Sequence, residues 1–382
     1  MAKCSADAAR LMHRRRNANE CFGACNKDDN PWQLSGGDIK WYTDWLAVRG
    51  VNLFIPHAFY YSIRGKRKDE RPPDVGPHSI WWAHYDAWST YWRRLSWLMT
   101  DIDLHAEAAV LCRNRDLCPD TVRPLFERQI GFQYIPESYF PACTVEDGAL
   151  WLHGHRYTAV LGDKALFPDA AHPEVSALEP DCRCDPPQPM LRCASFNKEG
   201  RACWLLVNEG NTPIKTRLTL PVDAPLCRYD LWSGQPCACP AERTAKGACL
   251  PLELPARGSL LLFTCTARES EALPLPPTYL SLAAPDFALA DEDAAHLTKT
   301  YRATLQITAT ELQTATPLLT LPGQEMAELT VNGQPAGVSF WPPHKFPLAG
   351  LLTPGENTLT LTLTGSPANR YGKHPVPYGL ER

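Results

Sequence analysis

Apolar positions in the first hundred residues alternate between helical spacing and unbroken runs. Ser35, with Asp38 three positions later, can cap the start of one helix, and Gly50 marks its end. The unbroken apolar run after Gly50 is typical of a strand buried on both faces. The pattern predicts helices over 2–14, 35–48 and 88–99, and strands over 17–22 and 51–56. This alternation is typical of consecutive units of a parallel α/β fold.

The remaining residues divide into a smaller α/β segment and two all-β modules. The expected elements of the segment 101–165 are strands over 105–112 and 132–138, a helix over 119–129, and further strands within 150–161. Residues 166–190 are rich in proline and lack periodicity, which predicts a linker. Short strands separated by turns then predict β-sandwich modules over 191–268 and 280–382. In the second module Asn332 and Gly333 predict a hairpin turn.

Composition narrows the class of protein. The net charge of −4 and the isoelectric point near 6.3 give no basic surface that would favour a nucleic-acid partner. No stretch approaches the roughly 20 apolar residues that span a bilayer. The first 16 residues lack the apolar run of a secretory signal, so we expect a cytoplasmic protein whose 15 cysteines are mostly reduced. The close pairs Cys182/Cys184 and Cys237/Cys239 leave a metal site as an alternative, although zinc sites usually use wider spacing.

Candidate chemistry lies where the first two strands end, because catalytic groups of parallel α/β barrels lie at the carboxyl ends of strands. Glu20 ends the first strand, and His57, Tyr60 and Tyr61 follow the second. A carboxylate there suits glycosidic bond cleavage, which uses two carboxyl groups. The alternatives are a salt-bridged surface glutamate and a structural histidine. One of the two adjacent tyrosines is expected to lie in the core.

The loop after the second strand combines charged residues with indole rings. Trp81 and Trp82 can form the wall of a sugar subsite, since tryptophan offers a flat apolar face to a sugar ring. The alternative is that these rings pack the following helix against the rest of the fold. The 12 tryptophans of the chain, most of them in its first third, fit both interpretations.

These residues carry a pattern that resembles a known group of enzymes. The pattern is a Glu-aromatic-Gly strand, a Trp-rich helix, a Gly-Val-Asn strand ending in Pro-His, and a Tyr-Tyr-Ser segment. It is carried here by Glu20, Phe22, Gly23, Trp41, Trp45, Gly50, Val51, Asn52, Pro56, His57, Tyr60, Tyr61 and Ser62. It resembles the barrel end of multi-domain glycoside hydrolases, the α-L-rhamnosidase-like and β-galactosidase-like enzymes with a family-2-type sugar-binding domain.

The resemblance implies a fold for the whole chain. Residues 1–100 resemble the C-terminal part of a (β/α)8 barrel, and 101–165 a small flavodoxin-like α/β segment around EAAVLC. Residues 191–268 resemble the β-sandwich that follows such barrels, and 280–382 a galactose-binding-like jelly roll. The expected fold class is therefore multi-domain α/β plus all-β.

The resemblance also implies a function. Glu20 would be the seventh-strand nucleophile or base acting on an oligosaccharide or glycoside. The pair Asn19-Glu20 also looks like the proton-donor motif of the fourth strand, but chain order argues against that placement. A complete barrel takes about 250 residues, and the fourth-strand carboxylate has no counterpart, so the chain resembles a C-terminal fragment. No metal site, cofactor or oligomeric state is assigned. The alternative functions are a non-catalytic carbohydrate-binding protein, with Trp341, His344 and Arg370 as sugar contacts, and an inactive remnant.

Overall fold

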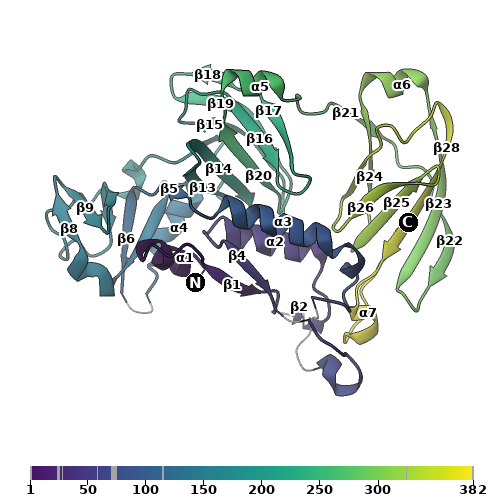
Figure 1. Ribbon diagram of the computed structural model, residues 1–382, viewed down its shortest axis with the longest axis horizontal. Helices are drawn as coiled ribbons and strands as arrows, with labels where there is room; N and C mark the ends of the chain where they lie inside the picture. Colours follow the sequence, from purple (N-terminus) through teal and green to yellow (C-terminus); the bar gives the residue numbers. More distant parts are fainter. Residues whose placement is uncertain are drawn as a thin grey trace. The chain divides into compact units, whose positions relative to one another are not determined.

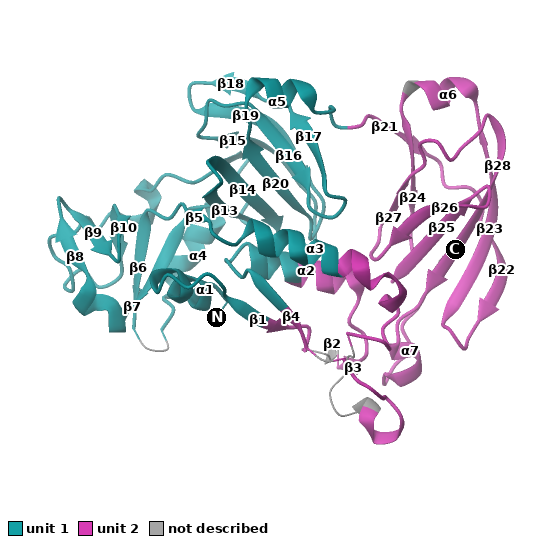
Figure 2. Cartoon of the chain, in the orientation of Figure 1, with its two compact units in different colours: residues 1–19, 43–54, 89–276 teal, residues 20–42, 55–88, 277–382 magenta. Residues whose placement is uncertain are grey.

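The computed structural model is built mostly of β-sheets with a few helices (Figure 1). It describes residues 2–23, 26–27, 29–57, 59–69, 75–113, 116–323 and 325–380. The chain forms two compact units, each assembled from separate stretches (Figure 2). The first unit contains residues 1–19, 43–54 and 89–276, and the second contains residues 20–42, 55–88 and 277–382.

The first unit contains a three-stranded parallel sheet in the order β11-β6-β7. Its strands are Ala159–Leu161, Ala108–Cys112 and Phe132–Pro136, accompanied by helices α1 (Ala2–Leu11) and α4 (Pro119–Glu127). Every residue of β6 is buried. Val110 packs in one cluster with Leu125 of α4, and Ala109 packs in another with Leu11 of α1. The predicted strand over 105–112 is thus present as β6, and it is covered on both faces.

The same unit contains two antiparallel sheets that share one apolar core. The six-stranded sheet has the order β17-β16-β20-β14-β13-β5 and the four-stranded sheet the order β12-β15-β19-β18. Trp204 and Leu262 of the larger sheet pack in one cluster with Leu218 and Leu250 of the smaller. The bounds are β5 (Asp103–Leu104), β12 (Arg183–Asp185), β13 (Leu191–Lys198), β14 (Arg201–Asn208), β15 (Ile214–Leu220), β16 (Leu226–Asp230), β17 (Gln235–Cys239), β18 (Glu242–Thr244), β19 (Gly247–Leu254) and β20 (Ser259–Thr264).

Part of the predicted linker belongs to these sheets, because β12 pairs with β15. Around them, the smaller elements of the unit are a three-stranded sheet of β8 (Thr144–Glu146), β9 (Ala149–Leu152) and β10 (His155–Tyr157), the helix α5 (Ala267–Ala272), and 3-10 helices at Glu137–Ala142 and Val175–Ala177.

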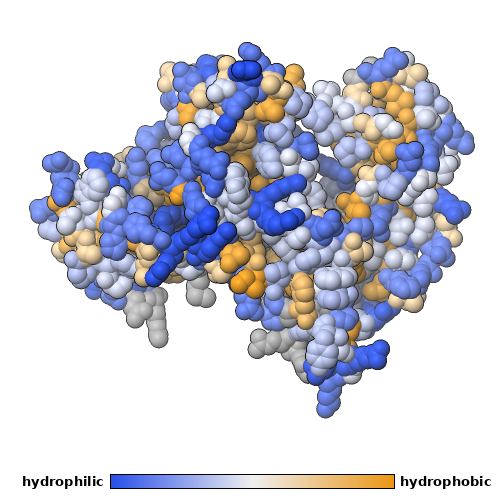
Figure 3. Space-filling model, viewed as in Figure 1, coloured by the Kyte–Doolittle hydropathy of each residue, from blue (hydrophilic) through white to orange (hydrophobic). Residues whose placement is uncertain are grey.

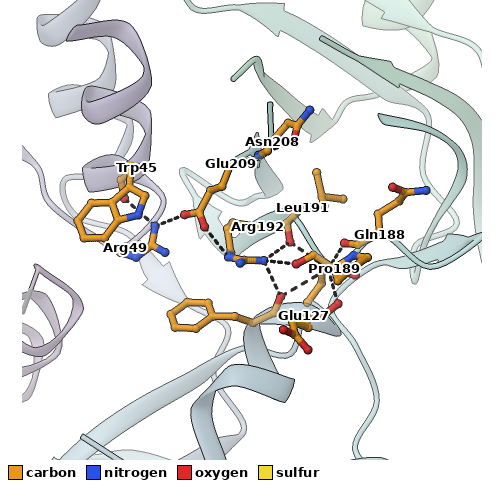
Figure 4. A network of polar contacts seen from close by, with 12 residues as sticks. Trp45, Arg49, Glu127, Gln188, Pro189, Leu191, Arg192, Asn208 and Glu209 are labelled. Carbon is orange, nitrogen blue, oxygen red and sulfur yellow. Dashed lines mark hydrogen bonds and ion pairs between the residues drawn. The ribbon is translucent and has the colours of Figure 1, made fainter. Parts of the chain in front are cut away.

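A buried network of charges joins separate parts of the first unit (Figure 4). The Glu209 carboxylate lies between two guanidinium groups, forming an ion pair with Arg49 and another, at 2.9 Å, with Arg192. The three side chains are only 9–12% exposed. The Arg49 guanidinium also lies 4.0 Å from the centre of the Trp45 ring and 5.2 Å from that of Phe126. One carboxylate therefore compensates two buried cations.

The second unit contains the C-terminal β-strands and segments from the first hundred residues. Its larger sheets have the orders β21-β24-β27 and β22-β23-β28-β25-β26, and share a core that includes Leu319, Leu329 and Leu361. Asn332 and Gly333 have φ angles of 52° and 79° and connect β25 to β26, which confirms the predicted hairpin turn. The bounds are β21 (Tyr279–Leu282), β22 (Ala288–Asp293), β23 (Thr298–Ile307), β24 (Thr316–Leu321), β25 (Met326–Val331), β26 (Gln334–Ser339), β27 (His344–Pro347), β28 (Gly355–Thr364), α6 (Ala309–Thr314), α7 (Ala368–Tyr371), β2 (Asn26–Lys27), β3 (Asn30–Pro31), and 3-10 helices at Gly65–Asp69 and Trp82–His84.

Helices α2 (Gly36–Ala47) and α3 (Tyr85–Leu98) lie close to their predicted positions. The backbone N–H of Asp38 donates to the Ser35 hydroxyl at 3.1 Å, and the Asp38 carboxylate accepts from the N–H of Ser35 at 3.1 Å. This reciprocal pair confirms the predicted cap. In the described part of the chain, no helix is long and apolar enough to cross a membrane.

Strands β1 (Ala18–Cys21) and β4 (Leu53–Pro56) form a two-stranded sheet. The expectation that the second strand is buried on both faces is wrong, because Leu53 is 38% and Ile55 47% exposed. The physical reason is that β4 pairs with β1 alone among the described strands, and the face carrying these two side chains is left open to solvent.

Candidate active site

The end of β1 presents a carboxylate to solvent. The side chain of Glu20 is 68% exposed, whereas the next residue, Cys21, is 2% exposed. The Cys21 thiol donates to the carbonyl of Ile55 at 3.6 Å. Burial raises the pKa of this thiol to about 12. Because only the thiolate is a good nucleophile, the Cys21 thiol is poorly suited to nucleophilic chemistry.

His57 lies one residue beyond β4 and faces Glu20. Its Nε2 atom is 3.8 Å from Oε1 of Glu20, and its backbone N–H donates to the carbonyl of Cys21 at 2.8 Å. The side chain is 14% exposed. Its Nδ1 atom is buried and has no hydrogen-bond partner among the residues that the structure describes. The structure thus brings together two of the residues singled out from the sequence.

Gly23 fits tightly against this imidazole. A Cβ atom at position 23 would lie 2.7 Å from Cδ2 of His57 and 3.2 Å from its Cγ. Real Cβ atoms essentially never come within 3.0 Å of such an atom. The glycine of the Glu-aromatic-Gly pattern is therefore required here by the close approach of the His57 ring.

Three aromatic rings form a partly exposed cluster in the same unit. Phe59 contacts Trp82 and Tyr85 edge to face, with its ring centroid 5.6 Å from that of Trp82 and 5.5 Å from that of Tyr85. The ring centroids of Trp82 and Tyr85 are 5.1 Å apart. Phe59 is 51% and Trp82 41% exposed. Burial raises the pKa of Tyr85 to about 12. We call Phe59, Trp82 and Tyr85 the aromatic cluster.

The other candidates from the sequence have different surroundings. Trp81 is 3% exposed, so it offers no open face to a sugar and fits the packing role instead. Tyr60 is half-buried and Tyr61 is 80% exposed, which agrees with one of the two lying inward. The guanidinium of Arg67 lies over the Tyr61 ring, 4.6 Å from its centre.

Sequence reasoning did not select Phe59 or Tyr85 as site residues. Phe59 lies two positions after His57, and its large apolar side chain is exposed directly beyond a strand end. That exposure was the missing observation, because a Phe within an apolar segment is more often buried.

The sugar contacts suggested for the second all-β module are only partly accessible. His344 is fully buried, and a ring nitrogen hydrogen-bonds the Ser339 hydroxyl at 2.9 Å. Burial lowers the pKa of His344 to about 4. Trp341 is half-buried, with its ring 6.0 Å from that of Trp88. Arg370 is exposed and donates to the carbonyls of residues 294 and 295.

Metal-ligating side chains do not cluster in the parts of the chain that the structure describes. No group of three or more His, Cys, Asp or Glu residues is positioned to hold an ion there, and every described cysteine is a free thiol. Cys182 directly precedes β12 and Cys184 lies within it.

Comparison with known proteins gives a structural match only. No family model matches the sequence, and no curated protein matches it. The fold is similar to that of a rhamnosidase from Novosphingobium sp. PP1Y, with a TM-score of 0.71 at 14% identity, over 97% of this chain and 45% of the rhamnosidase. A β-galactosidase from Bacillus circulans sp. alkalophilus aligns with a TM-score of 0.39 at 10% identity, over 69% of this chain and 57% of the galactosidase. By its match to the rhamnosidase, the chain has a glycoside-hydrolase-like fold and spans less than half the length of that enzyme.

Proposed function

We propose that this protein takes part in hydrolysis of O-glycosyl bonds, with Glu20 as one of the two carboxyl groups of the reaction. The observation that carries the proposal is the exposed Glu20 carboxylate beside His57, at the end of a strand in a glycoside-hydrolase-like fold. In such reactions one carboxyl group protonates the leaving oxygen, and the other attacks the sugar or activates water. We assign the second role to Glu20.

The same proposal covers the architecture in finer detail. Residues 1–100 are assigned to the closing part of a (β/α)8 barrel and 101–165 to a flavodoxin-like segment. The connecting segment 166–190 follows, and its end contributes β12 to the antiparallel sheets. Residues 191–268 and 280–382 are assigned to β-sandwich modules. The parallel sheet β11-β6-β7 and the paired sheets that share apolar cores support this division.

Substrate is held, in this proposal, by His57 and the aromatic cluster. The imidazole can hydrogen-bond a sugar hydroxyl while it also orients the Glu20 carboxylate. The exposed faces of Phe59 and Trp82 can pack on the apolar C–H face of a sugar ring. Tyr61 remains a proposed contact because it is exposed close to the same strand end.

The partner carboxyl group determines the expected activity. If Glu20 is the nucleophile or base, the resemblance gives the proton donor no counterpart in this sequence, and we expect substrates that need protonation to react poorly. Glycosides of 2,4-dinitrophenol need none, because that phenol leaves as a stable anion. We therefore expect slow hydrolysis of 2,4-dinitrophenyl rhamnosides or galactosides and little or none of the matching methyl glycosides.

Rates for both leaving groups, measured with the full chain, test the proposal. Strong turnover of the methyl glycosides would contradict the idea that one carboxyl group is lacking. Absence of turnover with every dinitrophenyl glycoside would contradict the catalytic role of Glu20. Retained binding of the same sugars in that case, measured by calorimetry, would instead favour a carbohydrate-binding protein whose contacts lie in the aromatic cluster.

A further inference from the structure

A cavity of the first unit lies between helix α3 and the six-stranded sheet. It has a volume of about 680 Å³ and a mainly apolar lining from α3, β13, β14, β16 and β20. Figure 3 shows apolar surface between α3 and these strands, next to strongly hydrophilic side chains. Cavities of 300–1,000 Å³ with apolar walls and a few polar groups are typical small-molecule sites.

The apolar lining follows from the alternation of side chains along β20. Leu260 and Leu262 point into the core shared with the four-stranded sheet. Leu261 and Phe263 therefore point to the opposite face, where they line the cavity together with Tyr229 of β16. This face of the sheet is apolar because helices cover part of it, and the cavity lies where that cover is incomplete.

A buried cation lies at the edge of this cavity. Lys198, at the end of β13, is 7% exposed. Its ammonium group donates to the carbonyl of Thr100 and lies 4.7 Å from the centre of the Trp97 ring. Among the described residues it forms no ion pair with a carboxylate, and Asp101, which acts on it from a longer distance, is bound by Arg15. Buried charges are normally paired, so Lys198 lacks the anion that such a site usually contains.

The other charges of the lining are also mostly positive. Arg94 is held by the carbonyls of residues 231–233, and Arg201 is paired with Glu269. Among the residues that the structure describes, Arg93 hydrogen-bonds only the hydroxyl of Thr90, at 2.9 Å, and so keeps donors available. The lining contains a single acidic residue, Glu199, beside four basic ones. The cavity therefore combines an apolar wall with an excess of positive charge.

We propose that this cavity binds a small amphiphilic anion, an aromatic or aliphatic body carrying one carboxylate or sulfonate group. The acid group pairs with Lys198 and Arg93, and the body packs on Leu261, Phe263 and Tyr229. The proposal concerns a second site and does not depend on the glycosidase function.

A matched pair of fluorescent probes tests this proposal on the full chain. The anionic probe is 8-anilinonaphthalene-1-sulfonate, and the neutral probe is N-phenyl-1-naphthylamine, which has the same rings without the sulfonate. We expect saturable binding of one anionic probe per chain. Lys198→Met and Arg93→Gln should each weaken binding of the anionic probe about tenfold and leave the neutral probe unchanged.

Cys203→Phe places a larger side chain in the cavity and should weaken the binding of both probes. Circular dichroism and melting curves of each variant test whether unfolding causes the loss of binding. If the Lys198 variant fails to fold, Arg93→Gln still tests the proposal, because it changes an exposed side chain. Non-saturable binding by the wild type would overturn the proposal. Equal losses of affinity for the two probes in both charge variants would also overturn it, because the charge of the ligand would then not matter for binding.

Discussion

At the scale of single residues, the contact between Gly23 and His57 sets the geometry next to Glu20. The imidazole occupies the space that any other side chain at position 23 would need. Its position relative to Glu20 therefore depends on a residue that carries no chemistry of its own.

Gly23→Ala should displace the His57 ring and destabilise the protein by about 1–3 kcal/mol, the usual cost of overpacking. The double variant Gly23→Ala/His57→Ala should restore the lost stability, because the second change opens the space again. Urea unfolding of the two single variants and the double variant measures this coupling. Strictly additive effects would show that the two residues are not in contact.

His344 makes a second residue-scale prediction, which concerns pH. The pKa of His344 is lowered to about 4, so the folded state keeps the ring neutral while the unfolded chain binds a proton below about pH 6.5. Its contribution to stability is complete above pH 6.5 and is lost as the pH falls towards 4, by about 3 kcal/mol at most. Melting temperatures between pH 7.5 and 4.5 should fall less steeply for His344→Gln than for the wild type. Parallel pH profiles would contradict a buried neutral histidine.

At the scale of elements, the ion network around Glu209 joins Arg49, two residues after the end of α2, to the strands of the six-stranded sheet. Glu209→Gln removes the negative charge that lies between two buried guanidinium groups and should cost about 3–5 kcal/mol. Glu242→Gln is the matched control, because the pair of Glu242 with Arg217 is exposed and should be worth less than about 1 kcal/mol. Chemical denaturation of the two variants should separate them clearly, and similar losses would contradict the account.

The elements themselves were largely predictable from local signals. The Ser35/Asp38 cap, the apolar run in β6 and the Asn332-Gly333 turn act over a few residues, and each has its predicted structure. Burial was less predictable, because it depends on layers contributed by distant segments. Thus β4 has the sequence of a doubly covered strand but exposes Leu53 and Ile55, and the structure alone distinguishes buried Trp81 from exposed Trp82.

The candidate site, too, was predictable only where local signals determine it. Glu20 and His57 could be selected because each directly ends a predicted strand, and strand order brings their ends together. The aromatic cluster could not be selected from the sequence. Phe59 follows a strand end, whereas Trp82 lies in a 3-10 helix and Tyr85 begins α3, more than 20 positions later.

At the scale of the whole molecule, the chain has a glycoside-hydrolase-like fold but spans only 45% of the rhamnosidase that it matches. That enzyme's activity does not transfer to this chain at 14% identity. The proposed chemistry therefore depends on one carboxylate, and the account is best tested by changing it alone.

The most direct measurement compares hydrolysis of a 2,4-dinitrophenyl glycoside by the wild type, Glu20→Gln and Glu253→Gln. Glu253 is the matched control, because its side chain is 69% exposed, close to the 68% of Glu20. We predict that Glu20→Gln lowers the rate at least about a hundredfold, the usual loss when a catalytic carboxylate is removed, and that Glu253→Gln leaves it unchanged. Equal rates for the wild type and Glu20→Gln would contradict the assignment of Glu20 as the catalytic carboxylate.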